Sequence, residues 1–115
     1  MLPAEHRLTD AGSYRLVIRT GRRAAARTLV LHLSAPDPLG ESTVGPRVGF
    51  VVSKAVGRAV TRNRVQRRLR HLVRQQLQLL PDSCALVIRA LPAAGAASSA
   101  ELHADLERCL RRVTS

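Results

Sequence analysis

Aromatic residues are almost absent from this chain. Tyr14 and Phe50 are the only two among 115 residues, and there is no tryptophan. The core must therefore be built from leucine, valine, isoleucine and alanine, and hydrophobic residues make up 45% of the chain, enough for a folded protein. A chain of this length fits one domain and buries about 65% of the surface that its unfolded form exposes. We predict that residues 1–115 form a single domain.

Cysteines and long apolar runs are also scarce. Cys84 and Cys109 lie far apart, form no CxxC pair and have no metal-ligand spacing, so we expect two buried free thiols. No apolar run reaches the length of about 18 residues that a membrane-spanning helix needs. The first residues, MLPAEHRL, lack the apolar stretch of a secretory signal. We therefore expect a cytoplasmic protein.

Acidic residues are missing from the middle of the chain, since no Asp or Glu occurs between Glu41 and Asp82. Within this region, residues 54–74 (KAVGRAVTRNRVQRRLRHLVR) hold eight Lys or Arg residues. The net charge is +11, and all basic residues except Lys54 are arginine, which forms bidentate contacts with phosphate and stacks on bases. A segment this basic repels itself unless a polyanion neutralises it. The partner is therefore expected to be a nucleic acid, with an anionic membrane as the alternative.

The basic segment also has helical periodicity, and we predict a helix over about 59–80. Its apolar stripe consists of Val65, Leu69, Leu72, Val73, Leu77 and Leu80. On a helical wheel, the opposite side carries Asn63, Arg67, Arg70, His71 and Arg74, with Arg64 flanking them and Arg62 on the apolar side of the first turn. Like charges three or four residues apart repel by a few tenths of a kcal/mol, which makes sense if a partner supplies the counter-charge. A membrane-surface helix is less well supported, because Trp and Phe anchors are missing.

The remaining periodic segments predict an α+β sandwich. Thr9 or Asp10 can cap a short helix whose stripe is Ala11, Tyr14, Val17 and Ile18, with Gly21 ending it. Alternation predicts strands over 27–34 and 47–53, separated by a loop or hairpin at 35–46, and the apolar run 84–90 is interpreted as a buried strand. Ser98 with Glu101 fits a capping box, followed by a final helix with the buried stripe Leu102, Leu106, Cys109, Leu110 and Val113.

A self-contained active site is not indicated. His6, His32, His71 and His103 are scattered, and neither a metal-binding histidine motif nor a paired-carboxylate nuclease site can be assembled from local spacing. We expect His32 on an exposed sheet face with Tyr14 and Ile18 nearby, a groove that would accept unstacked bases. Plain packing of the first helix on the sheet is the alternative for this cluster.

The basic segment resembles the protein subunit of bacterial ribonuclease P. The resemblance rests on Lys54, Val56-Gly57, Ala59-Val60, Arg62-Asn63-Arg64-Val65, Arg67 and Leu69-Arg70, which match the arginine–asparagine–arginine motif of that family. Upstream support comes from Arg7-Leu8, Tyr14, Val17, Gly21, the alternating strand 28–33 and Arg47-Val48-Gly49 before Ser53-Lys54. The resemblance implies a small four-stranded sheet with helices, in the chain order α-β-β-β-α-β-α, and a left-handed βαβ crossover at the basic helix.

The resemblance also implies a function. The family forms a ribonucleoprotein that removes the 5′ leader of precursor tRNA, and its RNA subunit performs the endonucleolytic hydrolysis with Mg²⁺ or another divalent metal. The protein subunit itself supplies no catalytic residue and holds no cofactor. The implied partners are the catalytic RNA and precursor tRNA, with no membrane. The implied RNA-binding residues are Lys54, Arg58, Arg62, Asn63, Arg64, Arg67, Arg68, Arg70 and Arg74, and the implied leader cleft contains Tyr14, Ile18 and His32.

This sequence departs from the family pattern at four positions. Gln66 stands where the family usually has lysine, and Tyr14, Ile18 and His32 occupy positions that are often Phe, Phe and an aromatic residue, respectively. We therefore expect weaker base stacking in the cleft. Two other readings of the residues remain: a ribosomal-type RNA-binding protein without enzymatic function, and a nuclease that needs no RNA.

Overall fold

A computed structural model describes residues 11–36, 45–81 and 83–114 of the chain. They form one four-stranded sheet in the spatial order β1-β2-β4-β3. The antiparallel pairs are β1–β2 and β2–β4, whereas β3 runs parallel to β4. The strands are β1 (Arg22–Ala25), β2 (Leu29–Ser34), β3 (Arg47–Val51) and β4 (Ala85–Ala90), and the α-helices are α1 (Ala11–Thr20), α2 (Ala59–Gln76) and α3 (Ser99–Thr114). The predicted order of elements is confirmed.

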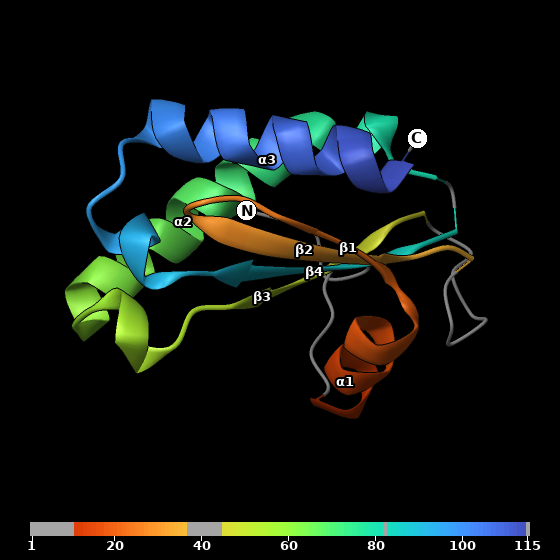
Figure 1. Ribbon diagram of the computed structural model, residues 1–115, viewed down its shortest axis with the longest axis horizontal. Coiled ribbons are helices and arrows are strands. Elements are labelled where there is room, and N and C mark those ends of the chain that lie inside the picture. The colour runs from red at the N-terminus through yellow and green to blue at the C-terminus, as the bar shows by residue number, and fades with distance from the viewer. Residues whose placement is uncertain (1–10, 37–44, 82, 115) are drawn as a thin grey trace.

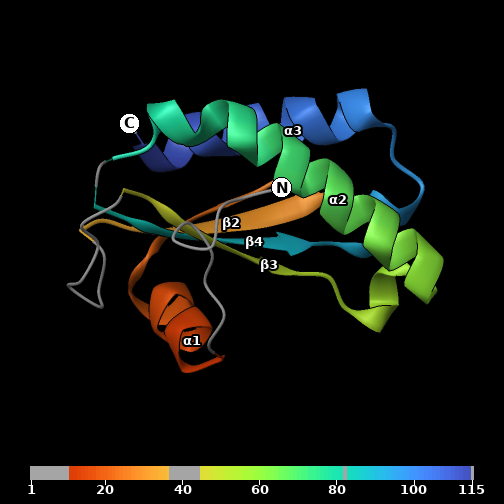
Figure 2. The ribbon, with the colours of Figure 1, turned by 180° about the vertical axis from the view of Figure 1, so that it is seen from behind.

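The sheet separates two unequal helical layers. In Figure 1, α2 and α3 lie together on one face of the sheet, and α1 lies alone on the other face. The view from behind shows the same division, with α2 running obliquely in front of α3 (Figure 2). Because α2 joins the parallel strands β3 and β4, it forms the βαβ crossover for which the resemblance implies a left-handed sense.

The main core lies between the sheet and the layer of α2 and α3. Leu29, Leu31 and Leu33 of β2 point into this core, as the alternating sequence predicts. The predicted apolar stripe of α2 is buried there as well, through Val65, Leu69, Leu72 and Val73. A smaller cluster on the opposite face packs Val17 of α1 against Ala85 and Val87 of β4. Cys84 and Cys109 are free and buried, as expected.

The boundaries of α2 and of three strands differ from the sequence prediction, and one strand is added. Residues Arg22–Ala25 form edge strand β1, which the resemblance implies but the periodicity of the sequence does not indicate. Helix α2 ends at Gln76 and continues as a short 3-10 turn, Leu77–Leu79, because Leu80 precedes a proline and adopts an extended conformation. The predicted strands shorten to 29–34, 47–51 and 85–90. The proposed caps Thr9 and Asp10, and most of the 35–46 loop, lie outside the described residues.

Helix α3 is fixed to the sheet by a buried carboxylate. The capping box at its start is confirmed, since Ser98 Oγ accepts the Glu101 N–H at 3.1 Å and the Glu101 carboxylate accepts the Ser98 N–H at 2.9 Å. One turn later, Asp105 accepts hydrogen bonds from the Thr28 hydroxyl at 2.6 Å and from the Thr28 N–H at 3.2 Å. Thr28 is fully buried, so the carboxylate satisfies two donors that water does not reach.

We predict that Asp105→Ala destabilises the fold by about 2–4 kcal/mol, because it leaves both Thr28 donors buried without an acceptor. Urea unfolding measures this change. The control is Glu107→Ala, which removes only a half-exposed pair with His103 and should cost less than about 1 kcal/mol. Equal midpoints for the two variants would contradict the role given to Asp105.

Candidate nucleic-acid interface

Helix α2 and the turn before it carry eight basic side chains. The turn η2 (Lys54–Val56) leads through Gly57, whose φ of +152° lies in the region that favours glycine, into the first turn of α2. Of the predicted RNA-binding residues, Lys54, Arg58, Asn63, Arg67 and Arg74 are exposed, and Arg62, Arg64, Arg68 and Arg70 are half-buried. We call this set the α2 ridge.

The charge of the α2 ridge is not compensated within the described residues. The ion pairs within the described residues join Arg27 to Glu101, Arg108 to Asp105 and His103 to Glu107, so none of them involves α2. No guanidinium group of the ridge therefore contacts a carboxylate in this part of the chain. The arrangement provides a row of cations with free hydrogen-bond donors, which is suited to phosphate oxygens.

Two ridge arginines also hold the fold together. Arg64 donates to the carbonyl oxygen of Gly95 at 3.1 Å, and Arg68 donates to that of Ala97 at 3.2 Å. These bonds tie α2 to the turn η4 (Pro92–Gly95) and to the start of α3. Arg62 is half-buried with its Nε unpartnered, which agrees with its predicted place on the apolar side of the first turn. The motif arginines are therefore not equivalent in the free protein.

A hollow of about 560 Å³ runs along the exposed side of α2, lined by Asn63, Gln66, Arg67, Arg70 and His71. Arg70 also acts on Tyr14 of α1. Burial raises the pKa of the Tyr14 phenol, and the hydrogen bond with Phe50 and the positive charge of Arg70 act in the opposite direction. The charge of Arg70 thus reaches Tyr14, the α1 side chain that packs on β3.

Tyr14 is tightly packed against β3. Its hydroxyl oxygen accepts the Phe50 N–H at 3.1 Å, and a Cβ at Gly49 would lie only 2.5 Å from its ring carbon Cζ. The lack of a side chain at Gly49 thus allows this ring to approach the β3 backbone closely. Tyr14 is not among the described residues that line the concavity shared by Ile18 and His32, so the lining does not group it with these two predicted cleft residues.

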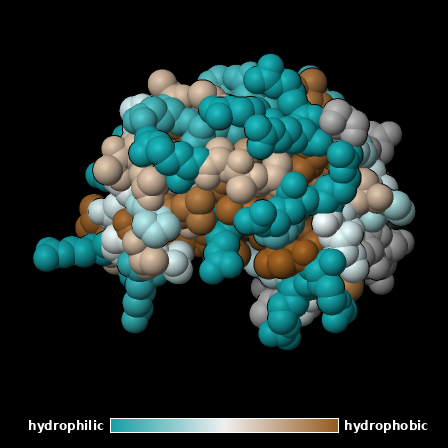
Figure 3. Space-filling model, in the orientation of Figure 1, coloured by the Kyte–Doolittle hydropathy of each residue, from teal (hydrophilic) through white to brown (hydrophobic). Residues whose placement is uncertain are grey.

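A second concavity, of about 360 Å³, lies on the sheet face that α1 covers only in part. Figure 3 shows it as a notch in the lower outline, between α1 and the end of the molecule that carries η2 and η4. We call it the α1 groove. Its described lining residues are Ile18, Arg23, Val30, His32, Ser53, Ala55, Arg89, Ala90, Leu91 and Pro92. The structure therefore brings Ile18 and His32 together, as predicted.

The expectation that His32 is exposed is wrong. The residue is only 8% exposed, because β2 is an inner strand flanked by β1 and β4. Arg23 stands directly opposite it on β1, and Arg89 of β4 pairs with Val30, two residues away on the same face. Burial lowers the pKa of the imidazole, and the charges of Arg23 and Arg89 lower it further. His32 is thus neutral near pH 7, and its Nδ1 is buried without a partner.

Arg23 and Arg89 are functional candidates that the sequence analysis did not identify. Each is exposed, and each reaches the α1 groove from a different strand. No local motif connects them, because only the pairing of β1 and β4 with β2 brings them to opposite sides of His32. The only hint in the sequence is that each of the two strands carries an arginine among small or apolar residues.

No group of three or more histidine, cysteine, aspartate or glutamate side chains is placed to hold a metal ion within residues 11–36, 45–81 and 83–114. Among the helices described, none is both long and apolar enough to span a membrane.

The sequence is similar to curated proteins across almost its whole length. The family model for ribonuclease P matches residues 2–114. The ribonuclease P protein component of a Nocardioides species is 58% identical over 113 residues, which cover 98% of this chain and 95% of that protein. The corresponding protein of Streptomyces avermitilis is 51% identical over 117 residues, covering 98% of this chain and 95% of its own length.

Solved structures share the fold. A mutant RNase P protein of Staphylococcus aureus, described as defective in mRNA degradation, superposes with a TM-score of 0.82 at 21% identity, covering 95% of this chain and 88% of that chain. The RNase P protein of Thermotoga maritima superposes with a TM-score of 0.75 at 19% identity, covering 93% and 96%. With the family model and the curated relatives, these findings show that the chain belongs to the bacterial ribonuclease P protein family.

Proposed function

We propose that this ribonuclease P protein binds the catalytic RNA subunit through the α2 ridge and the 5′ leader of precursor tRNA through the α1 groove. The observation that carries the proposal is the uncompensated charge of α2. Eight basic side chains lie on one helix and its preceding turn, and none pairs with a carboxylate within the described residues. A folded RNA presents phosphates at a density that can neutralise such a row.

The α1 groove is suited to a single strand rather than a duplex. Arg23 and Arg89 flank it and can hold phosphates, while Ile18 and Val30 offer apolar surface to a base or ribose. His32 is held neutral between them and can hydrogen-bond to a base edge. Because the described lining of the groove contains no aromatic ring apart from the imidazole, we expect phosphate contacts to outweigh stacking in the leader affinity of this protein.

In this proposal the protein contributes charge and position, and the RNA subunit carries the chemistry. Divalent metal, such as Mg²⁺, would act in the assembled RNA–protein enzyme, as the resemblance implies. The protein would lower the metal demand of the reaction by placing cations where phosphates of the two RNAs approach each other. Gln66 lines the hollow between Arg67 and Arg70, so these arginines can replace the phosphate contact of the usual lysine. A cytoplasmic location belongs to the same proposal.

Reconstitution is the primary test of this function. We expect leader cleavage at low magnesium concentration only when the protein and the RNA subunit are combined, because the protein supplies charge but no reacting group. Cleavage is followed by gel analysis of labelled precursor tRNA. Cleavage by the protein alone would support an independent nuclease, and RNA binding without any gain in cleavage would support a structural RNA-binding protein.

The charge of the α2 ridge lets us predict how RNA binding depends on salt concentration. Each phosphate neutralised changes the slope of log K against log salt by about −0.7 to −0.9. We therefore expect Arg67→Ala to weaken binding to the RNA subunit and to flatten this slope by nearly one contact in a filter-binding titration. Arg111→Ala is the matched control, since it removes an exposed arginine of α3 outside the ridge. Identical slopes for both variants and the unmodified protein would refute the proposed contact surface.

The α1 groove predicts selectivity for substrates that carry a leader. Arg89→Ala should reduce affinity for precursor tRNA about tenfold, roughly 1.4 kcal/mol, through loss of one charge-assisted phosphate contact. Affinity for mature tRNA, which has no leader, should stay unchanged. The measurement compares the two RNAs on the reconstituted complex, with Arg111→Ala as control. Equal losses for precursor and mature tRNA would remove the groove from leader recognition.

A further inference from the structure

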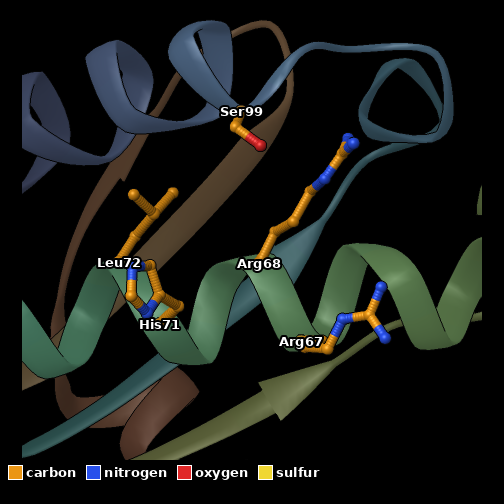
Figure 4. A pocket seen from close by; sticks show the side chains of 5 residues that line it. All are labelled: Arg67, Arg68, His71, Leu72 and Ser99. Carbon is orange, nitrogen blue, oxygen red and sulfur yellow. The ribbon is translucent and has the colours of Figure 1, made fainter.

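A second hollow, of about 320 Å³, lies between α2 and the start of α3. It is lined mainly by apolar surface from the side chains of Arg67, Arg68, His71, Leu72 and Ser99. In Figure 4, Arg68 and Leu72 extend from α2 toward the side of α3, where Ser99 points back toward α2. We call it the α2–α3 hollow. Leu72 is almost fully buried and forms part of its floor.

The charges around the α2–α3 hollow are positive. Its described lining includes three side chains that can be cationic and no carboxylate. The carboxylate of Glu101, on the first turn of α3, is already engaged by Arg27 at 2.6 Å and by the Ser98 N–H at 2.9 Å. The guanidinium of Arg68 is held by the Ala97 carbonyl oxygen at 3.2 Å, so its orientation is set before any partner arrives. An anionic partner with a flat apolar part would therefore meet a preformed site.

The α2–α3 hollow and the hollow along the outside of α2 share a wall. Arg67 and His71 line both of them. On the outer side, Asn63, Gln66 and Arg70 provide polar and charged groups, whereas the α2–α3 side is mainly apolar. A nucleotide is divided in the same way, because its phosphate is charged and the face of its base is apolar. Arginine and histidine side chains both stack on bases.

From this juxtaposition we infer that the α2–α3 hollow receives one unstacked base of the RNA subunit. The base would pass over the side chains of Arg67 and His71, and the phosphates of the same nucleotide would stay on the outer side of α2. This inference rests on the proposed binding of RNA by the α2 ridge. It adds a contact that depends on shape and stacking to an interface otherwise made by charge. A volume of about 320 Å³ reaches the lower end of the range typical of small-ligand sites.

Filling the hollow without changing charge tests the inference. Ser99→Phe places a ring in the hollow, and Ala100→Phe places the same ring on the neighbouring exposed position, which does not line it. We expect Ser99→Phe to weaken binding to the RNA subunit about tenfold, the size of one lost base-stacking contact, with an unchanged salt slope. Ala100→Phe should bind as the unmodified protein does. The inference would be overturned if Ser99→Phe bound the RNA subunit as tightly as the unmodified protein, or if both variants lost the same amount of affinity.

Chemical probing of the RNA supplies a readout that does not depend on affinity. One unpaired base of the RNA subunit should become protected from base-modifying reagents when the unmodified protein binds, and its reactivity should return with Ser99→Phe and with His71→Ala. Absence of any such base would overturn the inference. The outcome is separable from the proposed function, because Arg67→Ala tests the phosphate contacts through the salt slope alone. A changed slope for Arg67→Ala with normal binding by Ser99→Phe would reject the hollow and keep the interface.

Discussion

Electrostatic repulsion along α2 is the constraint on which the rest of the structure depends. Arg67, Arg70 and Arg74 are three or four residues apart, and each such like-charge pair costs a few tenths of a kcal/mol. Burial of the opposite side offsets this cost, since Val65, Leu69 and Val73 are almost completely inaccessible and each contributes about 1.5–3 kcal/mol. The core therefore holds the cations in one row against their mutual repulsion, and in the proposed complex the phosphates of the RNA relieve that repulsion.

The two faces of the sheet carry different candidate binding surfaces. On one face, α2 packs beside α3, and the two helices leave a mainly apolar hollow at the surface. On the other face, α1 covers only part of the sheet, so the α1 groove stays open beside His32. Helix α2 follows edge strand β3, on which Tyr14 of α1 also packs. In the proposed function, this arrangement lets one small domain contact a folded RNA and a single strand at the same time.

Sequence periodicity predicted those parts of the fold that depend on local rules. The stripe of α2, the alternation of β2 and the capping box at Ser98 each follow from contacts within one element, and the structure confirms them. Periodicity alone does not predict features that depend on register between distant strands: β1 as an edge strand, which only the resemblance implies, the burial of His32, and the convergence of Arg23 and Arg89. The bonds from Arg64 and Arg68 to backbone carbonyls were also missed, since no helical wheel shows what faces a side chain across a tertiary contact.

The account depends most directly on where the guanidinium groups of α2 lie in the assembled complex. Arginine-specific modification with phenylglyoxal, read by mass spectrometry with and without the RNA subunit, measures this for each residue. We expect Arg58, Arg67 and Arg74, which are exposed in the free protein, to be protected by the RNA, while Arg111 on α3 reacts equally in both states. Undiminished modification of these α2 arginines in a complex proven to contain RNA would contradict the central claim.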